Sequence, residues 1–418
     1  MDFGNHPCFN EKLRAKAARI HLPVAPKCNT QCNFCDRKFD CINESRPGVT
    51  SSVLNPKQAL RYLDSAMQKI PNVTVVGIAG PGDPFANAEE TLDTLRLVRA
   101  RYPEVLLCVA SNGLELAPYA ADLAGLKVGH VTITVNAATP ETAARVYAWV
   151  RYGRHIYRGV EAGTVMLREQ ERSLRLLAEA GVMVKVNVVV IPGVNDGEVE
   201  AIAKKTKSLG AGIFNLLPLY SVENTPFAGL APLPAEEFHA LKEAAGALLP
   251  LMGHCARCRA DAAGLIGQQA DPVLGNLLRE ASAPEVKTGK PFVAVGTEEG
   301  VFVNRHLGET DRFAVFALEN DMPKLVEIRK APIPGSGMER WVQLAELLSD
   351  CAAVLVSGVG INPKFTLESA GIAVIVMEGM IAESVTAILS GREVPKVLLR
   401  ENAGCSAGSC GGTGNGCG

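Results

Sequence analysis

The stretch Arg19-Ile-His-Leu-Pro-Val24 is an apolar run, and Cys28-Asn-Thr-Gln-Cys32-Asn-Phe-Cys35 follows it after three residues. The first segment predicts a β-strand, and the second is a C-x3-C-x2-C motif in the loop after that strand. Three thiolates can bind three irons of a four-iron cluster, which leaves the fourth iron available to a substrate. Barrel enzymes keep their sites in loops at the carboxyl ends of strands. The position therefore favours a catalytic cluster over a zinc knuckle or an electron-transfer cluster.

Five further apolar, β-branched runs continue the pattern, and amphipathic stretches separate them. The runs are Val73–Ala79, Val105–Ala110, Val131–Asn136, Val182–Ile191 and Gly212–Leu219. The expected helices are Pro56–Ile70, Ala88–Arg101, Arg168–Ala180, Gly197–Leu209 and Ala235–Leu248. Asn55 is placed to cap the first helix, with proline at its first position. Six βα units in a row predict a parallel sheet with right-handed crossovers over residues 1–280.

Polar side chains share one face of three of these runs. The sets are Thr132, Thr134 and Asn136; Lys185 and Asn187; and Cys108, Ala110 and Asn112. Parallel strands buried on both faces are usually continuous apolar runs. A polar face therefore favours a partial (β/α)6 TIM-like barrel with a ligand-filled lumen over a doubly wound sheet. The alternative is that neighbouring groups satisfy these polar residues.

Composition limits the classes of protein. The chain of 418 residues has a formal net charge of −2, which gives no sign of a nucleic-acid or membrane-surface binder. No apolar run reaches 18 residues without a charge, and the N-terminus lacks the apolar core of a signal peptide. We therefore expect a cytoplasmic protein, in which disulfides are rare. The twelve cysteines then indicate metal or cluster ligation.

A second pattern begins after the polar segment 281–290, which we interpret as a linker. Residues 291–400 predict a smaller α/β domain with early strands and a hairpin. Its later elements are a helix Arg340–Leu348, a strand Ala353–Ser357, another helix, a strand Ala373–Met377 and a helix Ala382–Leu389. Residues 401–418 are rich in Gly and include Cys405, Cys410 and Cys417, so they predict a flexible tail that either contacts metal or is inert.

The second predicted strand ends in Gly77-Ile-Ala-Gly80-Pro-Gly82-Asp83-Pro84. Glycines there allow the backbone to approach a ligand closely. With the cysteine motif, this segment resembles the radical S-adenosylmethionine (SAM) superfamily. That resemblance implies a cluster that binds SAM by its amino and carboxylate groups and cleaves it to a 5′-deoxyadenosyl radical. The candidate SAM-binding residues are Gly80, Gly82, Asp83, Asn112, Asn136 and Asn187.

The cysteines outside the motif allow a count of further clusters. Those of the first domain are Cys8, Cys41, Cys108, Cys255 and Cys258. Two more four-iron clusters with three ligands each need six ligands, so one imidazole would complete the count. The histidines near these segments are His6, His21 and His254, and the count does not choose among them. The alternative is one extra cluster with four ligands and a spare buried thiol, for which Cys108 is the natural candidate.

Six segments, in order over residues 1–270, resemble the NifB family of radical SAM maturases for the nitrogenase cofactor. They are His6-Pro-Cys8-Phe9, the cysteine motif, Glu44-Ser-Arg46-Pro-Gly48, Ala79–Pro84, Ile191-Pro-Gly-Val-Asn-Asp196 and Cys255-Ala-Arg257-Cys258-Arg259-Ala-Asp261-Ala-x-Gly264. The resemblance implies an enzyme of lyase or transferase type that fuses two four-iron clusters. A SAM-derived carbide and an extra sulfur would be inserted, giving the eight-iron precursor NifB-co.

The resemblance also implies ligands and partners. Cys8, His21 and Cys108 would hold one substrate cluster, and Cys41, Cys255 and Cys258 the other. Glu44 is a candidate transient ligand or base, unless it forms a salt bridge with Arg46. Arg257, Arg259 and Asp261 would offset cluster charge or form a surface ion-pair set. The implied partners are iron–sulfur cluster donors, cofactor carrier and scaffold proteins, and an electron donor such as ferredoxin.

Residues 291–395 resemble the NifX-type domain that binds precursors of the iron–molybdenum cofactor. The matching segments are Val293–Gly296, Val303–Gly308 and Val356–Gly360. The resemblance implies that this domain holds or passes on the product, with His306 as a possible ligand. Two other functions stay open: a different radical SAM enzyme with redox auxiliary clusters, and a cluster carrier without catalysis, which would leave the SAM motif unexplained.

Overall fold

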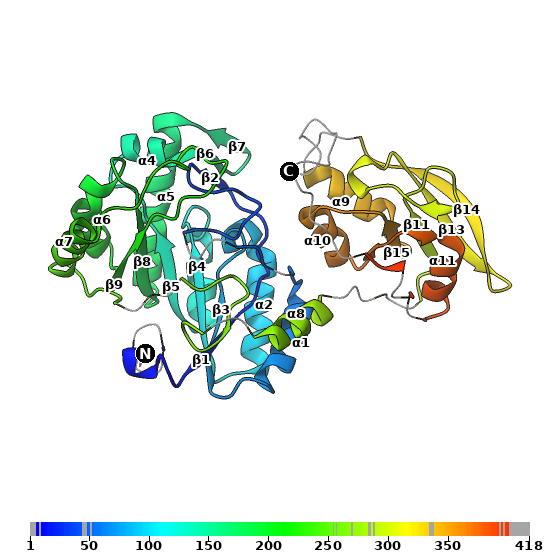
Figure 1. Ribbon diagram of the computed structural model, residues 1–418, viewed down its shortest axis with the longest axis horizontal. Helices are drawn as coiled ribbons and strands as arrows, with labels where there is room; N and C mark the ends of the chain where they lie inside the picture. The colour runs from blue at the N-terminus through cyan, green and yellow to red at the C-terminus, as the bar shows by residue number, and fades with distance from the viewer. Residues whose placement is uncertain are drawn as a thin grey trace. The chain divides into compact units, whose positions relative to one another are not determined.

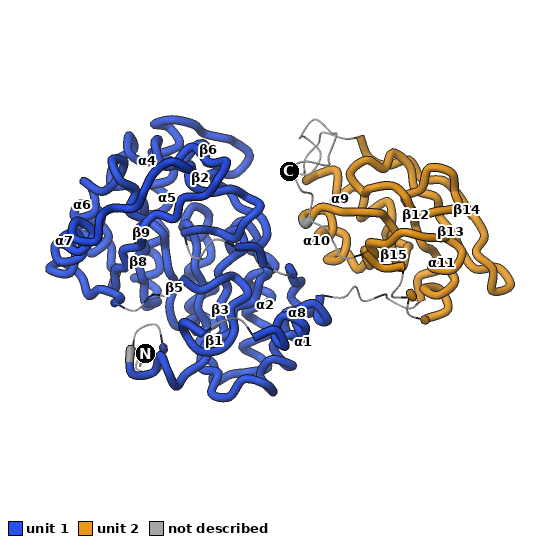
Figure 2. The backbone as a smooth tube through the Cα atoms, in the orientation of Figure 1, with its two compact units in different colours: residues 1–282 blue, residues 283–418 orange. Residues whose placement is uncertain are grey.

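The computed structural model describes residues 6–7, 10–43, 48–50, 52–253, 255, 257–268, 271–282, 286, 289–333, 338–392, 394–395 and 398–400. The chain divides into two compact units, residues 1–282 and 283–418 (Figure 2). Each unit has its own sheet and its own buried apolar clusters. No helix in the described ranges is long and apolar enough to cross a bilayer.

The first unit is built on a seven-stranded sheet with the order β10-β1-β3-β4-β5-β8-β9 (Figure 1). The strands are β1 (Ala18–His21), β3 (Val73–Ile78), β4 (Leu106–Ser111), β5 (Val128–Thr134), β8 (Met183–Val190), β9 (Ile213–Pro218) and β10 (Ala263–Gly264). Neighbours from β1 to β9 pair in parallel, and only β10 is antiparallel to its neighbour in this sheet. The predicted partial barrel is therefore confirmed.

Helices cover the outer face of this sheet. They are α1 (Pro56–Met67), α2 (Ala88–Arg101), α3 (Ala120–Gly125), α4 (Pro140–Val146), α5 (Gly159–Glu179), α6 (Val199–Ser208), α7 (Ala235–Gly246) and α8 (Pro272–Ala281). Helix α1 begins as its sequence predicts: the Asn55 side chain accepts from the backbone N–H of Gln58, and the Gln58 side chain accepts from that of Asn55. Such a capping box satisfies two of the helix's unpaired donors.

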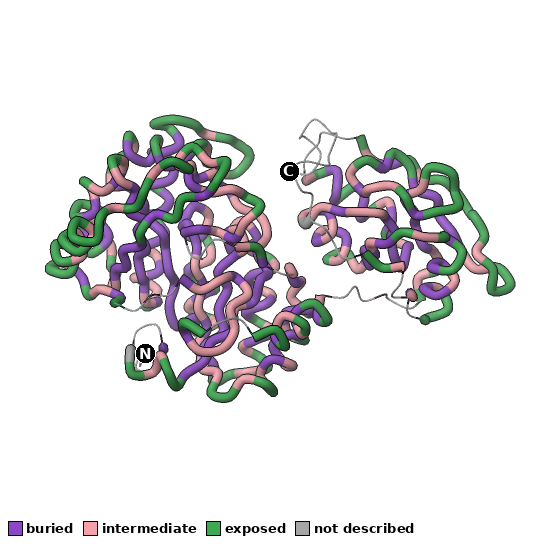
Figure 3. Tube along the Cα trace, viewed as in Figure 1, coloured by how far each residue is buried: buried purple, intermediate pink, exposed green. Residues whose placement is uncertain are grey.

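The predicted alternation of side chains along the strands is confirmed. Val131 and Ile133 of β5, and Val184 and Val186 of β8, lie in the core between sheet and helices. Burying each such side chain stabilises the fold by about 1.5–3 kcal/mol. Figure 3 shows the central strands as buried, with the exposed positions mostly on the outer helices and loops. The polar face of the strands is thus turned to the lumen.

The first unit differs from the sequence prediction in several places: α3, α4 and α8 were not predicted, and two further differences bear on the site. Helix α5 begins nine residues before the predicted start at Arg168. Its first turns contain Gly159 and Gly163, which have low helix propensity, but a Cβ on Gly163 would lie 2.2 Å from the carbonyl oxygen of Pro140. The glycine therefore permits close packing of α4 against α5, and that packing extends the helix.

The second difference is a small sheet, β2-β6-β7, that the sequence did not predict. Strand β2 (Thr30–Cys32) lies inside the cysteine motif, and β6 (Tyr147–Tyr152) and β7 (His155–Tyr157) form a hairpin. Strand β2 pairs with β6 from Thr30, opposite Val150, to Cys32. Three residues are too few to show a strand period, so only the distant hairpin reveals this strand.

The second unit contains a five-stranded mixed sheet with the order β14-β13-β11-β15-β16. Its strands are β11 (Phe292–Val295), β13 (Arg312–Glu319), β14 (Met322–Lys330), β15 (Cys351–Val356) and β16 (Ala373–Val376). The short strands β12 (Phe302–Val303) and β17 (Gly379–Met380) pair separately, and the helices are α9 (Met338–Leu347), α10 (Ile361–Ser369) and α11 (Ile381–Leu389). This confirms the predicted smaller α/β fold, and its hairpin is formed by β13 and β14.

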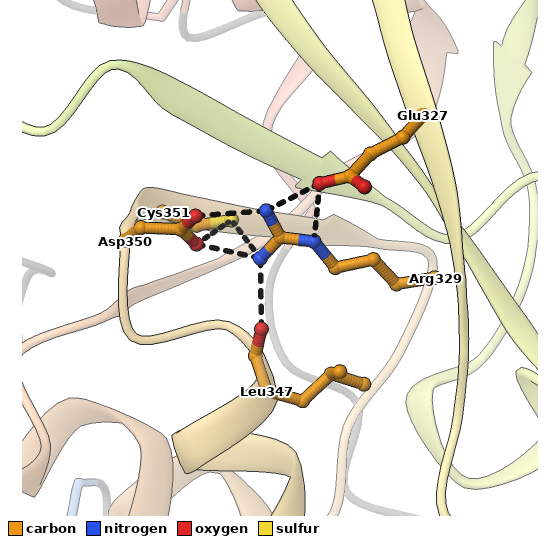
Figure 4. Close-up of polar contacts among 5 residues, drawn as sticks. All are labelled: Glu327, Arg329, Leu347, Asp350 and Cys351. Atoms are coloured by element: carbon orange, nitrogen blue, oxygen red, sulfur yellow. Dashed lines mark hydrogen bonds and ion pairs between the residues drawn. The ribbon is translucent and has the colours of Figure 1, made fainter.

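Arg329 joins three elements of this second unit (Figure 4). Its guanidinium donates to both carboxylate oxygens of Asp350, at 2.5 and 2.8 Å, and to Glu327 Oε1 at 2.6 and 2.9 Å. It also donates at 2.7 Å to the carbonyl of Leu347, the last residue of α9. A cation there satisfies an orphan carbonyl and complements the helix dipole.

Replacing Arg329 by methionine should destabilise the second unit by about 2 kcal/mol at pH 7, since bonds to charged groups are stronger than neutral ones but both acids are partly exposed. Arg329 lowers the pKa of Asp350. Its contribution is therefore complete above the ordinary carboxyl pKa of about 4 and is lost as the pH falls below it. Denaturant unfolding followed by Trp341 fluorescence, in a Trp149→Phe background, measures this.

Lys324→Met is the matched control, because the Lys324–Glu319 pair is 60% exposed on both sides. Its removal should change the unfolding free energy by less than about 1 kcal/mol. Equal losses in the two variants, or a loss for Arg329→Met that does not shrink in acid, would contradict the assignment.

Candidate metal centre

The motif cysteines meet in one cavity at the carboxyl end of β1. Cys28, Cys32 and Cys35 line it together with Gly82, Asp83 and Asn112. Cys32 is buried, and the other two thiols are partly buried. Pairing of β2 with β6 and a 2.8 Å bond from Asn33 N–H to the Val146 carbonyl fix the backbone of the motif. The three thiols are thus held on a supported loop.

The electrostatics of these thiols favour a bound cation. Burial and the neighbouring Cys28 raise the pKa of Cys35 to about 12. The pKa of Cys32 is raised further, by burial and then by Cys35 and Cys28. The neighbouring thiolates therefore oppose ionisation of Cys32 and Cys35. Metal binding relieves that repulsion and releases the protons, so this donor set fits the three-thiolate end of an iron–sulfur cluster.

The glycine-rich segment is held against the chain that leads into the motif. Gly82 N–H donates to the Ala25 carbonyl at 2.6 Å, and Asp83 N–H donates to the Lys27 carbonyl at 2.7 Å. A Cβ on Gly82 would lie 2.1 Å from the Lys27 oxygen. Gly80 has a φ of 121°, which a residue with a side chain rarely adopts. Both glycines are therefore needed for the backbone path past the cysteine loop.

Replacing Gly82 by alanine should lower the affinity for SAM at least tenfold, which is about 1.4 kcal/mol, because the new Cβ must push two backbone segments apart. Equilibrium dialysis of SAM against the reconstituted protein measures this. Gly197→Ala is the control, because a Cβ there would meet nothing within 4 Å. Unchanged SAM affinity in Gly82→Ala would show that this segment is not part of the SAM site.

Asp83 lies in the same cavity, but backbone and hydroxyl donors occupy its carboxylate. It accepts from Asn112 N–H at 2.6 Å, Phe85 N–H at 2.9 Å and the Ser111 hydroxyl at 3.0 Å. Burial raises the pKa of this carboxyl, and the hydrogen bonds oppose that rise. Asp83 thereby joins the loops after β3 and β4. Asn112 Nδ2 in turn donates to Asn29 Oδ1 at 2.7 Å, beside Cys28.

The other two candidate asparagines lie in different places. Asn136 is fully buried and does not line the cavity of the motif thiols: its Oδ1 accepts from Val189 N–H at 2.8 Å, and its Nδ2 donates to Asn43 Oδ1 at 3.1 Å. Asn43 donates in turn to Cys32 Sγ at 3.8 Å. Asn136 thus supports the cysteine loop from behind. Asn187 lines a second cavity, where Asn215 donates to its Oδ1 at 2.9 Å.

This second cavity lies against the polar face of the sheet. It is lined by His21, Ile78, Ala79, Cys108, Val109, Ala110, His130, Thr132, Lys185, Asn187, Met252, Cys255, Cys258 and Ile266. Ile78 and Ala79 border this cavity, whereas Pro81, Gly82 and Asp83 border the first one. The single segment 78–83 therefore separates the two cavities, and they adjoin.

One row of register partners across the sheet places a thiol between two imidazoles in the second cavity. Across neighbouring strands, His21 pairs in register with Gly77, Gly77 with Cys108, and Cys108 with His130. A Cβ on Gly77 would lie 2.6 Å from Cys108 Sγ and 3.2 Å from His21 Cδ2. The glycine leaves room for the thiol and the imidazole to come together in front of β3.

His21 and Cys258, two of the predicted ligands, each contact a neighbouring backbone or charged group. His21 Nδ1 lies 3.0 Å from the Arg259 carbonyl, which leaves Nε2 as the free lone pair. Burial and then Arg19 lower the pKa of His21 to about 4, so the imidazole is neutral at pH 7. The Arg19 guanidinium donates to Cys258 Sγ at 3.1 and 3.3 Å.

The two implied cluster sets are brought together only in part. His21 and Cys108 share the second cavity with Cys255 and Cys258, whereas Cys41 lines the first cavity. Arg259 bridges the segments of Cys41 and Cys258, because it pairs with Asp40 at 3.7 Å and Asp261 at 3.0 Å. Cys8, Glu44, Arg46, His254 and the tail cysteines lie outside the described residues.

Arg257 is buried, donates to the Pro218 carbonyl and lies over the Tyr220 ring at 4.4 Å. Arg257 therefore anchors the Cys255–Cys258 segment to the end of β9. Because it is buried, it is not part of a surface ion-pair set.

Sequence reasoning missed Arg19 and His130 as residues of the site. Strand β5 begins at Val128, three residues before its predicted start, and so it includes His130. Extending the period of two backwards from Thr134 and Thr132 would have placed His130 on the lumen face. Arg19 carried no such signal, because its role depends on Cys258, 239 residues away.

In the second unit, His306 has a local structural role. Its Nδ1 accepts from Gly308 N–H at 3.1 Å, which caps the short helix Leu307–Glu309. Its ring packs on Gly358, where a Cβ would lie 2.6 Å from Cδ2. Partial burial lowers its pKa.

Comparisons with known proteins found a matching family for each of the two units. The model of the radical SAM superfamily matches residues 22–206, and the model described as dinitrogenase iron-molybdenum cofactor matches residues 289–391. The FeMo cofactor biosynthesis protein NifB of Chlorobaculum tepidum is 50% identical over 421 residues, covering 100% of this chain and 99% of the relative. The protein of the same name from Klebsiella pneumoniae is 37% identical, covering 88% of this chain and 86% of its own length.

Proposed function

The chain belongs to the family of the FeMo cofactor biosynthesis protein NifB and is a radical SAM enzyme, and from that premise we propose that it fuses two four-iron clusters into the eight-iron precursor NifB-co. A carbon derived from SAM becomes the central carbide, and a further sulfur is added. The observation that carries this proposal is a pair of adjoining cavities. One is lined by the three motif thiols, and the other by three further thiols and His21.

Cys28, Cys32 and Cys35 hold the resident cluster, with SAM beside Gly80, Gly82 and Asn112. When bound, the cluster and SAM supply one-electron cleavage of the sulfonium bond. The chain itself positions and shields that chemistry: Asp83 ties the loops after β3 and β4 together, and Asn136 and Asn43 support the Cys32 loop.

The second cavity, together with Cys41 of the first cavity, receives the substrate clusters. Cys108 and His21, with Cys8, bind one of them, and Cys255 and Cys258, with Cys41, bind the other. Three ligands for four irons leave one iron of each substrate cluster open, which suits clusters that must fuse. Arg19 and Lys185 offset the negative charge of thiolate-bound clusters, since Arg19 donates to Cys258 Sγ and Lys185 lines the same cavity.

The family also supports a proposal about the wider setting of the reaction. We place the reaction in the cytoplasm, with iron–sulfur cluster donors, an electron donor such as ferredoxin, and carrier or scaffold proteins for the product. Residues 291–400 hold or hand on the product, and 281–290 serve as a linker, whereas the predicted tail 401–418 lies outside the described residues. The match of residues 289–391 to the dinitrogenase iron-molybdenum cofactor family supports that role.

Iron and acid-labile sulfide counted after anaerobic reconstitution test the proposal. We expect about twelve irons per chain, the content of three four-iron clusters. About four irons would leave an ordinary radical SAM enzyme and contradict the substrate-cluster assignment. Stoichiometric zinc with little iron would exclude cluster chemistry altogether.

Turnover with SAM and reductant separates the remaining alternatives. The maturase should consume its two extra clusters and release an eight-iron species, whereas redox auxiliary clusters would survive turnover unchanged. A carrier would not cleave SAM at all.

A further inference from the structure

We propose that His6, Cys108 and His130 form a separate site for one divalent first-row transition-metal ion, with two imidazoles and one thiolate as ligands. The proposal goes beyond the fusion of clusters and depends neither on SAM nor on a cluster. It rests on where three side chains from three parts of the first unit meet.

The ligand atoms are close enough to share one ion. One nitrogen from each imidazole and the Cys108 sulfur all lie within 4.8 Å of one another. In a tetrahedral site with metal–ligand bonds of about 2.0–2.3 Å, ligand atoms stand about 3.3–3.8 Å apart. Small side-chain rotations therefore suffice to close the site around an ion.

The backbone holds two of the three ligands in place. Cys108 and His130 are register partners on β4 and β5, so both side chains leave the same face of the sheet at the same height. The His6 ring lies against the His130 ring at 4.4 Å, in an edge-to-face arrangement of 83°. The backbone of His6 is held in part by a 3.1 Å hydrogen bond from Asn10 N–H to the His6 carbonyl.

The surroundings favour a transition metal over a hard cation. His6 is 2% exposed and His130 is 4% exposed, so both rings are shielded from bulk water. Nitrogen and thiolate donors suit iron(II), cobalt(II) and zinc(II), whereas magnesium and calcium require oxygen donors.

Three protein ligands leave a fourth position open toward the cavity, as in catalytic metal sites. The site is distinct from the His21 side of Cys108. His21 lies across Gly77 from Cys108, and its Nδ1 faces the Arg259 carbonyl. Cys108 belongs both to the ion site and to the proposed cluster site with His21. The ion and that cluster therefore cannot be bound at the same time. The ion would thus occupy the cluster-free enzyme.

Cobalt(II) titration of the full-length, cluster-free chain tests the proposal. The background carries two substitutions. Cys32→Ser removes one ligand from the motif thiols, and Cys258→Ser removes one from the set Cys41, Cys255 and Cys258. We expect one tight cobalt with d–d bands of a four-coordinate site and the charge-transfer band of a single thiolate. Cys108→Ser should remove that band. His130→Gln and His6→Gln should each weaken binding by more than about a hundredfold, the upper range for losing an outer-shell partner.

His21→Gln is the matched control and should leave the cobalt affinity within about twofold. If His21→Gln weakens cobalt as much as His130→Gln does, the ion sits with the cluster ligands and the proposal is overturned. A cobalt complex without a thiolate band also overturns it. Far-UV circular dichroism verifies the fold of each variant, and His130→Asn is the second variant if His130→Gln fails to fold.

Discussion

Replacing Cys32 by serine should abolish cleavage of SAM while the protein keeps its fold. Cys32 is one of three thiols in the first cavity, and its backbone is paired with Tyr147 of β6. Serine preserves that pairing and the side-chain volume but cannot hold an iron as thiolate does. The yield of 5′-deoxyadenosine, measured after reduction with dithionite, should fall by more than about a hundredfold, beyond the cost of an outer-shell change. The iron content should fall by about four atoms, one cluster.

Cys351→Ser provides the matched control. Cys351 is also a buried thiol, but it lies at the start of β15 in the second unit. Its loss removes a thiol without touching either cavity, so SAM cleavage and iron content should match those of the unmodified chain. Substantial cleavage by Cys32→Ser would mean that the C-x3-C-x2-C motif does not hold the reactive cluster.

The barrel could be predicted because its signals are local. Six strand runs separated by amphipathic helices set the parallel order, and the alternation of Val184 and Val186 with Lys185 and Asn187 identified the lumen face. Strand β2 was not predictable in this way, because pairing with β6, more than a hundred residues later, creates it. Long-range pairing of that kind leaves no period in three residues.

In the site, too, local features could be predicted from the sequence, whereas contacts between distant residues could not. The cysteine motif and the glycine-rich segment are each a continuous stretch of sequence, and both contribute residues to the first cavity. The Arg19–Cys258 contact joins residues that are far apart in the chain, so it could not be predicted from the sequence around either residue. Asp83 illustrates a further limit: its type and position suggested a ligand contact, yet its carboxylate accepts three donors from the protein itself. Sequence gives the residue type, and only packing gives the partner.

Replacing Cys108 by serine should block formation of the eight-iron product while SAM cleavage continues. Cys108 lies in the second cavity, in register with Gly77 and His130, and does not line the cavity of the motif thiols. Its loss removes one of the three ligands proposed for a substrate cluster, so we expect about eight irons per chain instead of about twelve. Product is measured by extraction of the eight-iron cluster after turnover, and cleavage by the yield of 5′-deoxyadenosine.

Gly77→Ala tests the same geometry without removing a ligand. The new methyl group would lie 2.6 Å from Cys108 Sγ and 3.2 Å from the His21 ring, so the thiol and the imidazole must separate. We expect product yield to fall at least tenfold, about 1.4 kcal/mol, with SAM cleavage retained. Unimpaired product from Cys108→Ser would remove Cys108 from the ligand set. Normal yield from Gly77→Ala alone would instead mean that His21 and Cys108 do not need to meet in front of β3.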